Sequence, residues 1–382
     1  MNTATRPPGT MTPTLTPTLS AAEVVQAMRA SRGFAHKRDI SHVADALTRC
    51  LPGGRADLTL GAAQGVMLGD DCAVIPDADG HLLFAIEGLV DDFVAAMPWF
   101  AGYSAVMVNL SDIAAMGGRP IAVVDALWSA GSAQAEPILQ GMAAASAAYG
   151  VPIVGGHSNQ RASRAQLAVA VLGRAEALLS SFAARPGHTL LMAVDLRGQW
   201  EGDYPFWNAS TRAPAARLRD DLALLPEVAE AGLCGAAKDI SMAGVLGTAL
   251  MLAESSQVGL RLDLSALPHP PGHGPLESPD AFLRWLQAFP SFGYLLSVAP
   301  ADVPAVQARF LARGLACAPF GQVERGSAVW LQHGGLGEGR EGMAGHAGHE
   351  ATAHQAATAD LALLWDWQRE PFIAGQAREH AA

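Results

Sequence analysis

Charged residues are scarce in this chain of 382 residues, where Asp, Glu, Lys and Arg together account for 16%. Lysine is nearly absent: Lys37 and Lys238 are its two occurrences, and the excess of acidic residues gives a formal net charge of −11. This balance argues against nonspecific binding to nucleic acid or to an anionic membrane surface. It favours a protein that holds cations between carboxylates and that has extensive buried faces or a large subunit interface.

Closely spaced cysteines are also missing. The four cysteines lie far apart in the chain: Cys50, Cys72, Cys234 and Cys317. Without a C-x-x-C pair the sequence predicts neither a zinc knuckle nor a redox motif, and a reducing, cytoplasmic location is expected.

No run of 18 residues is both apolar and free of charge, so the sequence predicts a soluble protein with no membrane-spanning segment. The best candidate, residues 102–128, is interrupted by Asp112, Arg119 and Asp125. Residues 1–20 are rich in Thr and Pro and contain no apolar core. This composition predicts a disordered tail instead of a signal peptide or an anchor.

Apolar residues make up half of the sequence, which is enough for about two domains with cores of their own. Helical and strand patterns alternate, and this predicts an α/β fold in which sheets are covered by helices. We predict helices over residues 21–30, 36–47, 103–116, 133–150, 244–255, 280–289 and 303–314. We predict strands over residues 81–89, 120–128, 151–156, 166–175, 189–196, 259–264, 291–298 and 318–324.

The composition divides the chain into five parts. They are a disordered tail (1–20), an N-terminal domain (21–178), a C-terminal domain (179–335), a Gly- and His-rich linker (336–358) and a C-terminal segment (359–382). We expect the C-terminal segment to dock on the body, because burial favours its two tryptophans. His346, His349 and His354 are interpreted as part of a low-complexity linker and not as a metal site.

An acidic pair, Asp70 and Asp71, follows Gly69 directly before a predicted apolar strand. Gly-Asp pairs are common in solvated turns, which is one interpretation. The other is a Mg²⁺ site, because this cation takes one or two carboxylates together with substrate phosphates. The pair by itself leaves both interpretations open.

A second acidic group, in residues 84–93, follows an apolar run. If this segment is extended, Glu87, Leu89 and Asp91 face one side of it. A single acidic residue at this position often only marks the end of a strand. Three within six residues, after another acidic pair, favour a site for a metal and phosphate.

The predicted helix over residues 103–116 carries Asn109 and Asp112, which are three residues apart and share a face. Polar groups on the buried side of an apolar helix cost free energy unless they are hydrogen-bonded or bind an ion. A satisfied structural pair is the alternative. Gly117 then ends the helix, as a left-handed residue commonly does.

Two glycines, Gly155 and Gly156, are expected at a strand end, where their small size lets the backbone approach a ligand. His157 follows them. A neutral imidazole is a poor ligand for Mg²⁺, which prefers oxygen, so a functional His157 would transfer a proton or contact phosphate. The alternative is a histidine that caps the turn.

A further polar segment contains Lys238 and Asp239, just before a helix that is expected to begin near Ser241. The free N–H groups at such a helix start are suited to hold an anion. Neither a Walker A pattern nor G-x-G-x-x-G is present, so the sequence supports neither a P-loop nor a Rossmann site.

Taken in this order, the segments resemble the superfamily of aminoimidazole ribonucleotide (AIR) synthase. In the first half GDDCAVI, AIEGLVDDF and VNLSDIAAMGGRP are similar to thiamine-monophosphate kinase, and GGHSN stands where that kinase has G-G-D-T. The second half is similar to AIR synthase-related proteins through AKDISMAGVLGTALMLAESS, FPSFGYLLSV and LWDWQREPF. The resemblance covers roughly residues 35–335 and the terminal segment.

The resemblance implies a PurM-like fold with two α/β domains. In this fold the N-terminal domains of two protomers pair their sheets into a barrel-like dimer interface, and ATP binds in a cleft with Mg²⁺. Carried over by position, the metal ligands would be Asp71, Glu87 and Asp112. The nucleotide-binding residues would be Asp70, Asp71, Asn109, Asp112, Gly155, Gly156 and Ser241. The catalytic residues would be His157, Lys238 and Asp239.

Two residues depart from the kinase pattern, since His157 and Met242 stand where that family has Asp. We therefore expect an ATP- and Mg²⁺-dependent enzyme that phosphorylates or activates a small molecule and works as a homodimer. The alternatives are a true thiamine-monophosphate kinase and a non-catalytic dimeric nucleotide-binding protein.

Overall fold

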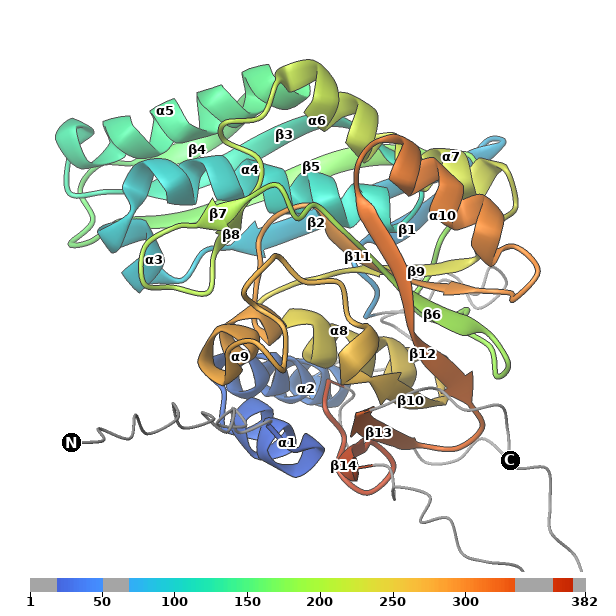
Figure 1. Ribbon diagram of the computed structural model, residues 1–382. Helices are drawn as coiled ribbons and strands as arrows, with labels where there is room; N and C mark the ends of the chain where they lie inside the picture. Colours follow the sequence, from blue (N-terminus) through green and yellow to red (C-terminus); the bar gives the residue numbers. More distant parts are fainter. Residues whose placement is uncertain (1–18, 51–68, 334–359, 374–382) are drawn as a thin grey trace, which may run out of the picture.

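The computed structural model of the chain describes residues 19–50, 69–333 and 360–373, and all structural statements concern these residues (Figure 1). Most of the expected disordered tail, the linker with its three histidines and residues 374–382 lie outside the described residues. The described part contains no helix with the length and hydropathy needed to cross a bilayer. All four cysteines are free thiols.

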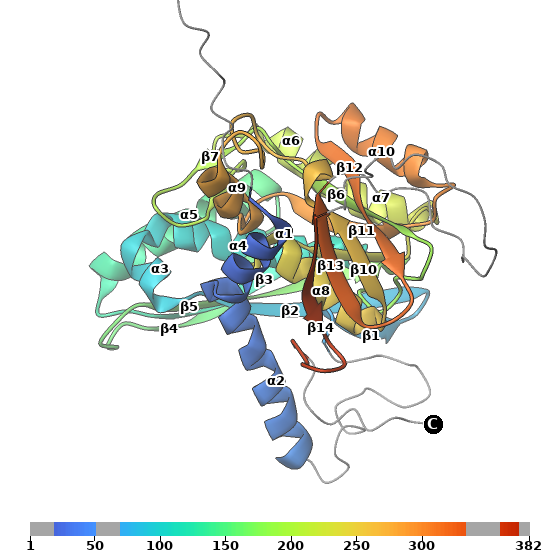
Figure 2. The ribbon, with the colours of Figure 1, turned by 60° about the horizontal axis from the view of Figure 1, so that its bottom comes forward.

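The first sheet has five strands in the order β1-β2-β5-β3-β4. Their bounds are β1 Ala73–Asp77, β2 Gly80–Gly88, β5 Gln166–Ala175, β3 Arg119–Trp128 and β4 Ile153–Asn159. Strands β3 and β4 are parallel, and the other neighbours are antiparallel. Helices α4 (Pro98–Ala115) and α5 (Ser132–Tyr149) lie together on one side of this sheet (Figure 2). Helix α4 is apolar on nearly all sides and is accordingly buried along most of its length.

The second sheet has seven strands in the order β14-β13-β10-β12-β6-β11-β9. Their bounds are β14 Asp360–Asp366, β13 Ala328–His333, β10 Gly259–Asp263, β12 Ala316–Glu324, β6 Thr189–Val194, β11 Gly293–Val298 and β9 Ala236–Asp239. Strands β6 and β11 are buried on both faces, which explains their continuous apolar sequences.

Each face of the second sheet belongs to a different hydrophobic core. Leu190 and Met192 of β6 pack in a core that includes residues of helices α8 (Gly244–Ser256) and α9 (Pro279–Leu286). Leu191 of β6 packs in the other core, with α4, α7 (Leu224–Glu230) and α10 (Val303–Ala312). Successive side chains of β6 point to opposite faces of the second sheet. One face therefore packs in the same core as α4 and the first sheet.

The two ends of the described chain meet on the second sheet. Helix α1 (Ala21–Arg29) is capped by Ser20 and lies against β14. Phe34 of α2 (Arg32–Cys50) packs against Trp365 and Phe372, with ring centroids 6.3 and 5.2 Å away. Side chains of residues 21–34 therefore contribute to the core of the second sheet, although the sequence groups them with the first domain.

The local structure differs from the sequence interpretation at three places. Strand β2 ends at Gly88 and helix α3 (Asp91–Ala96) follows, so the strand alternation does not extend to Asp91. Helix α8 begins at Gly244, three residues after Ser241. The pair Gly155 and Gly156 lies inside β4, because this strand continues to Asn159.

Several short elements were not predicted. They are helices α3, α6 (Ala215–Leu222) and α7, the 3-10 helix Leu264–Ala266, and strands β7 (Gln199–Trp200), β8 (Trp207–Asn208), β9, β13 and β14. Strand β1 is the apolar strand that the sequence predicts after Asp71. The pair β7 and β8 forms a small hairpin whose connecting loop reaches the candidate site.

Candidate active site

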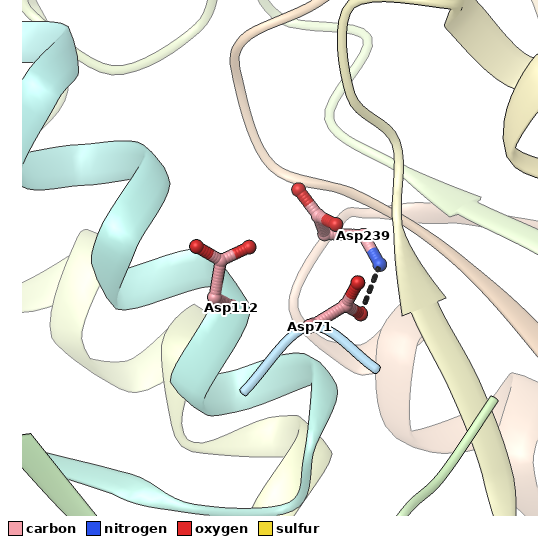
Figure 3. A group of neighbouring side chains, drawn as sticks. All are labelled: Asp71, Asp112 and Asp239. Atoms are coloured by element: carbon pink, nitrogen blue, oxygen red, sulfur yellow. Dashed lines mark hydrogen bonds between the residues drawn. The ribbon is translucent and has the colours of Figure 1, made fainter. Parts of the chain in front are cut away.

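Three aspartates from distant parts of the chain meet between the two sheets. One carboxylate oxygen each of Asp71, Asp112 and Asp239 lies within 4.8 Å of the others (Figure 3). Asp71 lies on the loop before β1, Asp112 is in the last turn of α4, and Asp239 ends β9. The contact between α4 and β9 brings the last two together. The sequence singled out all three residues, and the structure places them in one group.

Asp112 is buried and incompletely hydrogen-bonded. Its residue is 5% exposed, and its Oδ2 atom has no hydrogen-bond partner among the described residues. A buried carboxylate oxygen without a partner costs free energy, so a group that fills the position stabilises the site. The donors are carboxylate oxygens, which are the ligands that Mg²⁺ prefers. The residues present therefore fit a magnesium ion.

Asp71 is held by the second sheet. The Lys238 ammonium forms an ion pair with Asp71, and the side chains of both are less than a tenth exposed. The backbone N–H of Asp239 also donates to Asp71 Oδ2, at 3.4 Å. Burial lowers the pKa of Lys238, but the carboxylates of Asp71, Asp70 and Asp239 outweigh this and leave it raised. Lys238 therefore stays protonated and anchors the loop before β1 to β9.

The three carboxylates have raised pKa values. Desolvation raises the pKa of Asp71 to about 7, against the attraction of Lys238, which lowers it. Desolvation also raises the pKa of Asp112, and the negative charges of Asp239 and Glu87 add to this. For Asp239 the main cause is again desolvation, opposed by Lys238 and Lys37. Crowded, buried carboxylates of this kind favour either protons or a divalent cation.

A cavity of about 240 Å³ opens beside the aspartates. Its acidic wall residues are Glu87, Asp92, Asp112 and Asp239, and its basic ones are Arg32 and Lys37. Its aromatic wall residues are Phe93, Tyr204, Phe206 and Phe289. The rings of Tyr204 and Phe206 are stacked, with centroids 5.0 Å apart. The cavity thus combines a charged floor with an apolar wall, as small-molecule sites commonly do.

Glu87 lies on the cavity wall and outside the group of three. Desolvation raises its pKa, while the charge of Lys37 lowers it. Val169, the neighbour of Glu87 across the sheet, is buried, so the Glu87 side chain points to the side that α4 covers. Its role as a metal ligand stays a prediction, and its position allows it to bind a second ion or a ligand.

Asp70 and Asn109 support the site from behind. Asp70 accepts hydrogen bonds from the Ser180 hydroxyl at 2.7 Å and from the Ser181 backbone at 3.1 Å. These bonds fix the loop that carries Asp71. Asn109 is fully buried and donates from Nδ2 to the carbonyl of Ala105 at 2.7 Å. Neither residue belongs to the cavity wall among the described residues.

Ser241 lines the cavity, although not as the start of a helix. Its backbone N–H donates to Thr248 Oγ1 at 3.4 Å, so this N–H is not free for an anion. Its hydroxyl is buried without a hydrogen-bond partner among the described residues, and the same holds for Ser104, which also lines the cavity. Both hydroxyls are available to a ligand.

The structure does not bring Gly155, Gly156 and His157 to this cavity. They lie on β4, at the edge of the first sheet, and His157 is exposed. His157 pairs with Ala126 on the neighbouring strand β3. Ala126 shares a face of the sheet with the exposed Val124, and this face lies away from α4. Within the described residues of one chain, His157 therefore lies away from the three aspartates, and its catalytic role stays a prediction.

The sequence missed the aromatic wall and the contribution of α2. Tyr204 and Phe206 come from the loop between β7 and β8, and Lys37 comes from an N-terminal helix. Single aromatic residues in a loop give no periodic signal. The scarcity of lysine is the one sequence feature that draws attention to Lys37.

We predict that Mg²⁺ binding releases protons. The folded protein keeps the Asp71 proton up to about pH 7, whereas an ordinary aspartate loses it near 3.8, so metal binding has to displace it below about pH 7. Metal affinity is therefore expected to rise with pH through about 7, by roughly tenfold per pH unit for each proton released. Calorimetric titration at pH 6.5 in two buffers of different ionisation enthalpy measures this release. Identical heats in both buffers, with an affinity that does not change with pH, would contradict the prediction.

Comparison with known families agrees with the sequence resemblance. The model of the AIR synthase related protein N-terminal domain matches residues 69–175, and that of the C-terminal domain matches residues 190–333. The chain therefore belongs to the AIR synthase-related family, and the predicted PurM-like α/β fold is confirmed.

Individual relatives are consistent with this family. The chain is 44% identical to an uncharacterized protein of Synechocystis sp., over 82% of this chain and 92% of that one. It is 28% identical to a thiamine-monophosphate kinase of Methanospirillum hungatei, over 53% of this chain and 71% of that one. The solved Thermotoga maritima PurL complexed with ATP is 19% identical, with a TM-score of 0.63 over 82% of this chain. This chain spans about half of that protein, covering 49% of it.

Proposed function

We propose that this protein is an ATP- and Mg²⁺-dependent enzyme that phosphorylates or activates a small molecule. The observation that carries the proposal is the group of Asp71, Asp112 and Asp239 at the edge of a cavity with an apolar wall. Two of the similar proteins agree with it: one is a thiamine-monophosphate kinase, and the other is a PurL complexed with ATP. Direct phosphoryl transfer and ATP-driven activation of an amide or ring are both compatible with this site.

In this proposal Asp71, Asp112 and Asp239 would hold Mg²⁺. Bound there, the ion neutralises the charge of the phosphates while the protein positions the reactants. Lys238 favours the ionised form of Asp71 and orients it, since the two are paired in a buried position. The hydroxyls of Ser104 and Ser241 donate hydrogen bonds to the bound molecule, and the aromatic wall excludes water from it.

The test is an ATP-consumption assay against a panel of phosphorylated and amide-containing metabolites, with Mg²⁺ omitted as the control. At least one member of the panel is expected to raise ATP consumption, and only when Mg²⁺ is present. ATP binding without turnover on any member would favour the non-catalytic dimeric nucleotide-binding protein. Absence of any Mg²⁺-dependent ATP binding would end the proposal.

Thiamine-monophosphate kinase is the second candidate, because a kinase of this name is among the relatives. His157 and Met242 weigh against it, because each stands where the resembled family has a carboxylate. Thiamine monophosphate is therefore included in the panel. Its conversion at a rate above all other members would make this kinase the function and would show that both replacements are tolerated.

We also propose that the protein is a homodimer that pairs through the first sheet. The face opposite α4 and α5 exposes large apolar side chains on all five strands: Ile75, Phe84, Ile86, Ile121, Val124, Val154 and Leu172. Phe84 pairs with Leu172, and Ile86 pairs with Ala170 next to Val124, so these residues form one continuous surface. A second copy of the same apolar sheet is the self-complementary cover for such a face.

Ile86→Glu is expected to convert the dimer into a monomer, because it places a charge in the middle of this face. Light scattering after size exclusion should show the mass halved at micromolar concentration. Leu276→Glu is the matched control, since Leu276 is 70% exposed and Ile86 65%, yet Leu276 lies far along the chain from the first sheet. A monomeric wild type, or an Ile86→Glu variant of unchanged mass, would refute the dimer.

A further inference from the structure

The N-terminal helix α2 contributes a cation to the cavity from outside the domains that define the family. The family models match residues 69–175 and 190–333, and α2 precedes both. Lys37 and Arg32 of this helix nevertheless line the same cavity as the carboxylates. The segment before the first family domain therefore completes one wall of the site.

The position of α2 is fixed by close packing. The first carbon of a side chain on Gly33 would collide with the carbonyl oxygen of Met242, so glycine is required for this approach. The next residue, Phe34, is 1% exposed and lies in the core with Trp365. Lys37 follows one turn later on the same helix. The packing of Gly33 and Phe34 therefore fixes its position.

The other basic residues near the cavity are already occupied. Lys238 forms the ion pair with Asp71. Arg32 lies 3.5 Å from Asp92 and donates from Nε to His36 at 3.2 Å. Among the described residues, Lys37 forms no ion pair like those of Lys238 and Arg32. Its charge acts on Glu87 and Asp239 at longer range and lowers the pKa of both.

We propose that Lys37 binds a phosphate group in the cavity, either that of ATP or one carried by the second substrate. This inference rests on the proposed function. When Mg²⁺ occupies the carboxylates, their charge is neutralised and Lys37 loses its counter-charge. A phosphate next to the ion restores it, and lysine is a common binder of phosphate as a point charge.

The experiment compares Lys37→Met with Arg49→Met by calorimetric titration with Mg²⁺ alone, Mg²⁺–ATP and thiamine monophosphate. Arg49 is an exposed cation on the same helix, about 18 Å further along it, so both variants lose one positive charge. Lys37→Met is expected to weaken one phosphate ligand by at least about tenfold relative to Arg49→Met, as loss of a charged hydrogen bond does. Lys37→Arg should recover most of this loss.

The outcomes separate the two sources of phosphate. Weaker binding of Mg²⁺–ATP assigns Lys37 to the nucleotide. Weaker binding of thiamine monophosphate, with unchanged binding of Mg²⁺–ATP, assigns it to the second substrate. If Lys37→Met only tightens binding of Mg²⁺ alone, or equals Arg49→Met for every ligand, Lys37 is a counter-charge for Glu87 and the inference is wrong. If the wild type binds no Mg²⁺–ATP at all, the proposed function itself fails. Melting curves of both variants show whether the fold is intact.

Discussion

Asp112→Asn is expected to weaken Mg²⁺–ATP binding by on the order of 100-fold, with a loss of turnover at least as large. Mutation of a residue that only hydrogen-bonds to a metal ligand already lowers metal affinity or activity by roughly 10–100-fold. The loss of a direct ligand should therefore reach the upper end of this range. The substitution keeps the volume of the side chain and removes its charge. Calorimetric titration with Mg²⁺–ATP and a coupled ATP-consumption assay measure the two effects.

The same variant should fold as well as the wild type or better without metal. Asp112 is buried, its Oδ2 lacks a partner, and its raised pKa shows that the charged form is disfavoured in the folded protein. The neutral amide removes this penalty, which is largest above the raised pKa. Asp79→Asn serves as the control, since the Asp79 side chain is 92% exposed in the turn between β1 and β2. Unchanged nucleotide affinity in Asp112→Asn would make Asp112 a structural residue.

Lys238→Met is expected to lower the free energy of unfolding by about 3–5 kcal/mol at pH 8. Removal of one partner from a buried ion pair leaves the other charge without compensation, which costs this amount. Here Asp71 would remain buried beside Asp239 and Asp70, whose charges also raise its pKa. Denaturant unfolding measures the loss.

A double variant tests the cause. If the unpaired Asp71 charge is responsible, Asp71→Asn combined with Lys238→Met should be more stable than Lys238→Met alone. The deficit of Lys238→Met should also shrink as the pH falls from 8 toward about 7. Loss of Lys238 removes the charge that lowers the pKa of Asp71, so this carboxyl becomes neutral by protonation at a higher pH in the variant than in the wild type. A deficit that neither the second substitution nor low pH relieves would show that Lys238 acts through packing.

The acidic part of the site could be predicted from the sequence because its physical signal is local. Asp112 stands out as a charge within an apolar helix, and Asp71 stands out within an acidic pair before a strand. Asp239 follows one of the two lysines, and the resemblance to the AIR synthase superfamily adds the order of these segments. The strands and helices of the two sheets follow from periodicity for the same reason.

The rest of the site depends on tertiary contacts that no local pattern reveals. The aromatic wall requires the β7–β8 loop to pack against Phe93 and Phe100. Lys37 requires α2 to pack against α8 and next to Met242. The catalytic role of His157 stays a prediction. Its place in the kinase-like pattern predicts a catalytic residue, yet it lies on the edge strand β4, away from the cavity of its own chain.

The boundaries of elements were predicted least well where side chains compete with the backbone. Ser241 precedes an apolar helix and resembles a start signal, but its N–H bonds to Thr248 and the helix begins at Gly244. The predicted strand over residues 81–89 agrees with β2 to within one residue, but no helix is predicted for the acidic residues that follow it. They start a helix, where their negative charges favour the positive N-terminal end of α3.

The most direct test of the account is a crystal structure of the protein with ATP and Mn²⁺ in place of Mg²⁺, in which anomalous scattering locates the metal. The account predicts a peak within coordination distance of carboxylate oxygens of Asp71, Asp112 and Asp239, with the triphosphate bound to it in the adjoining cavity. A well-ordered nucleotide elsewhere, or a metal that none of these three aspartates contacts, would contradict it.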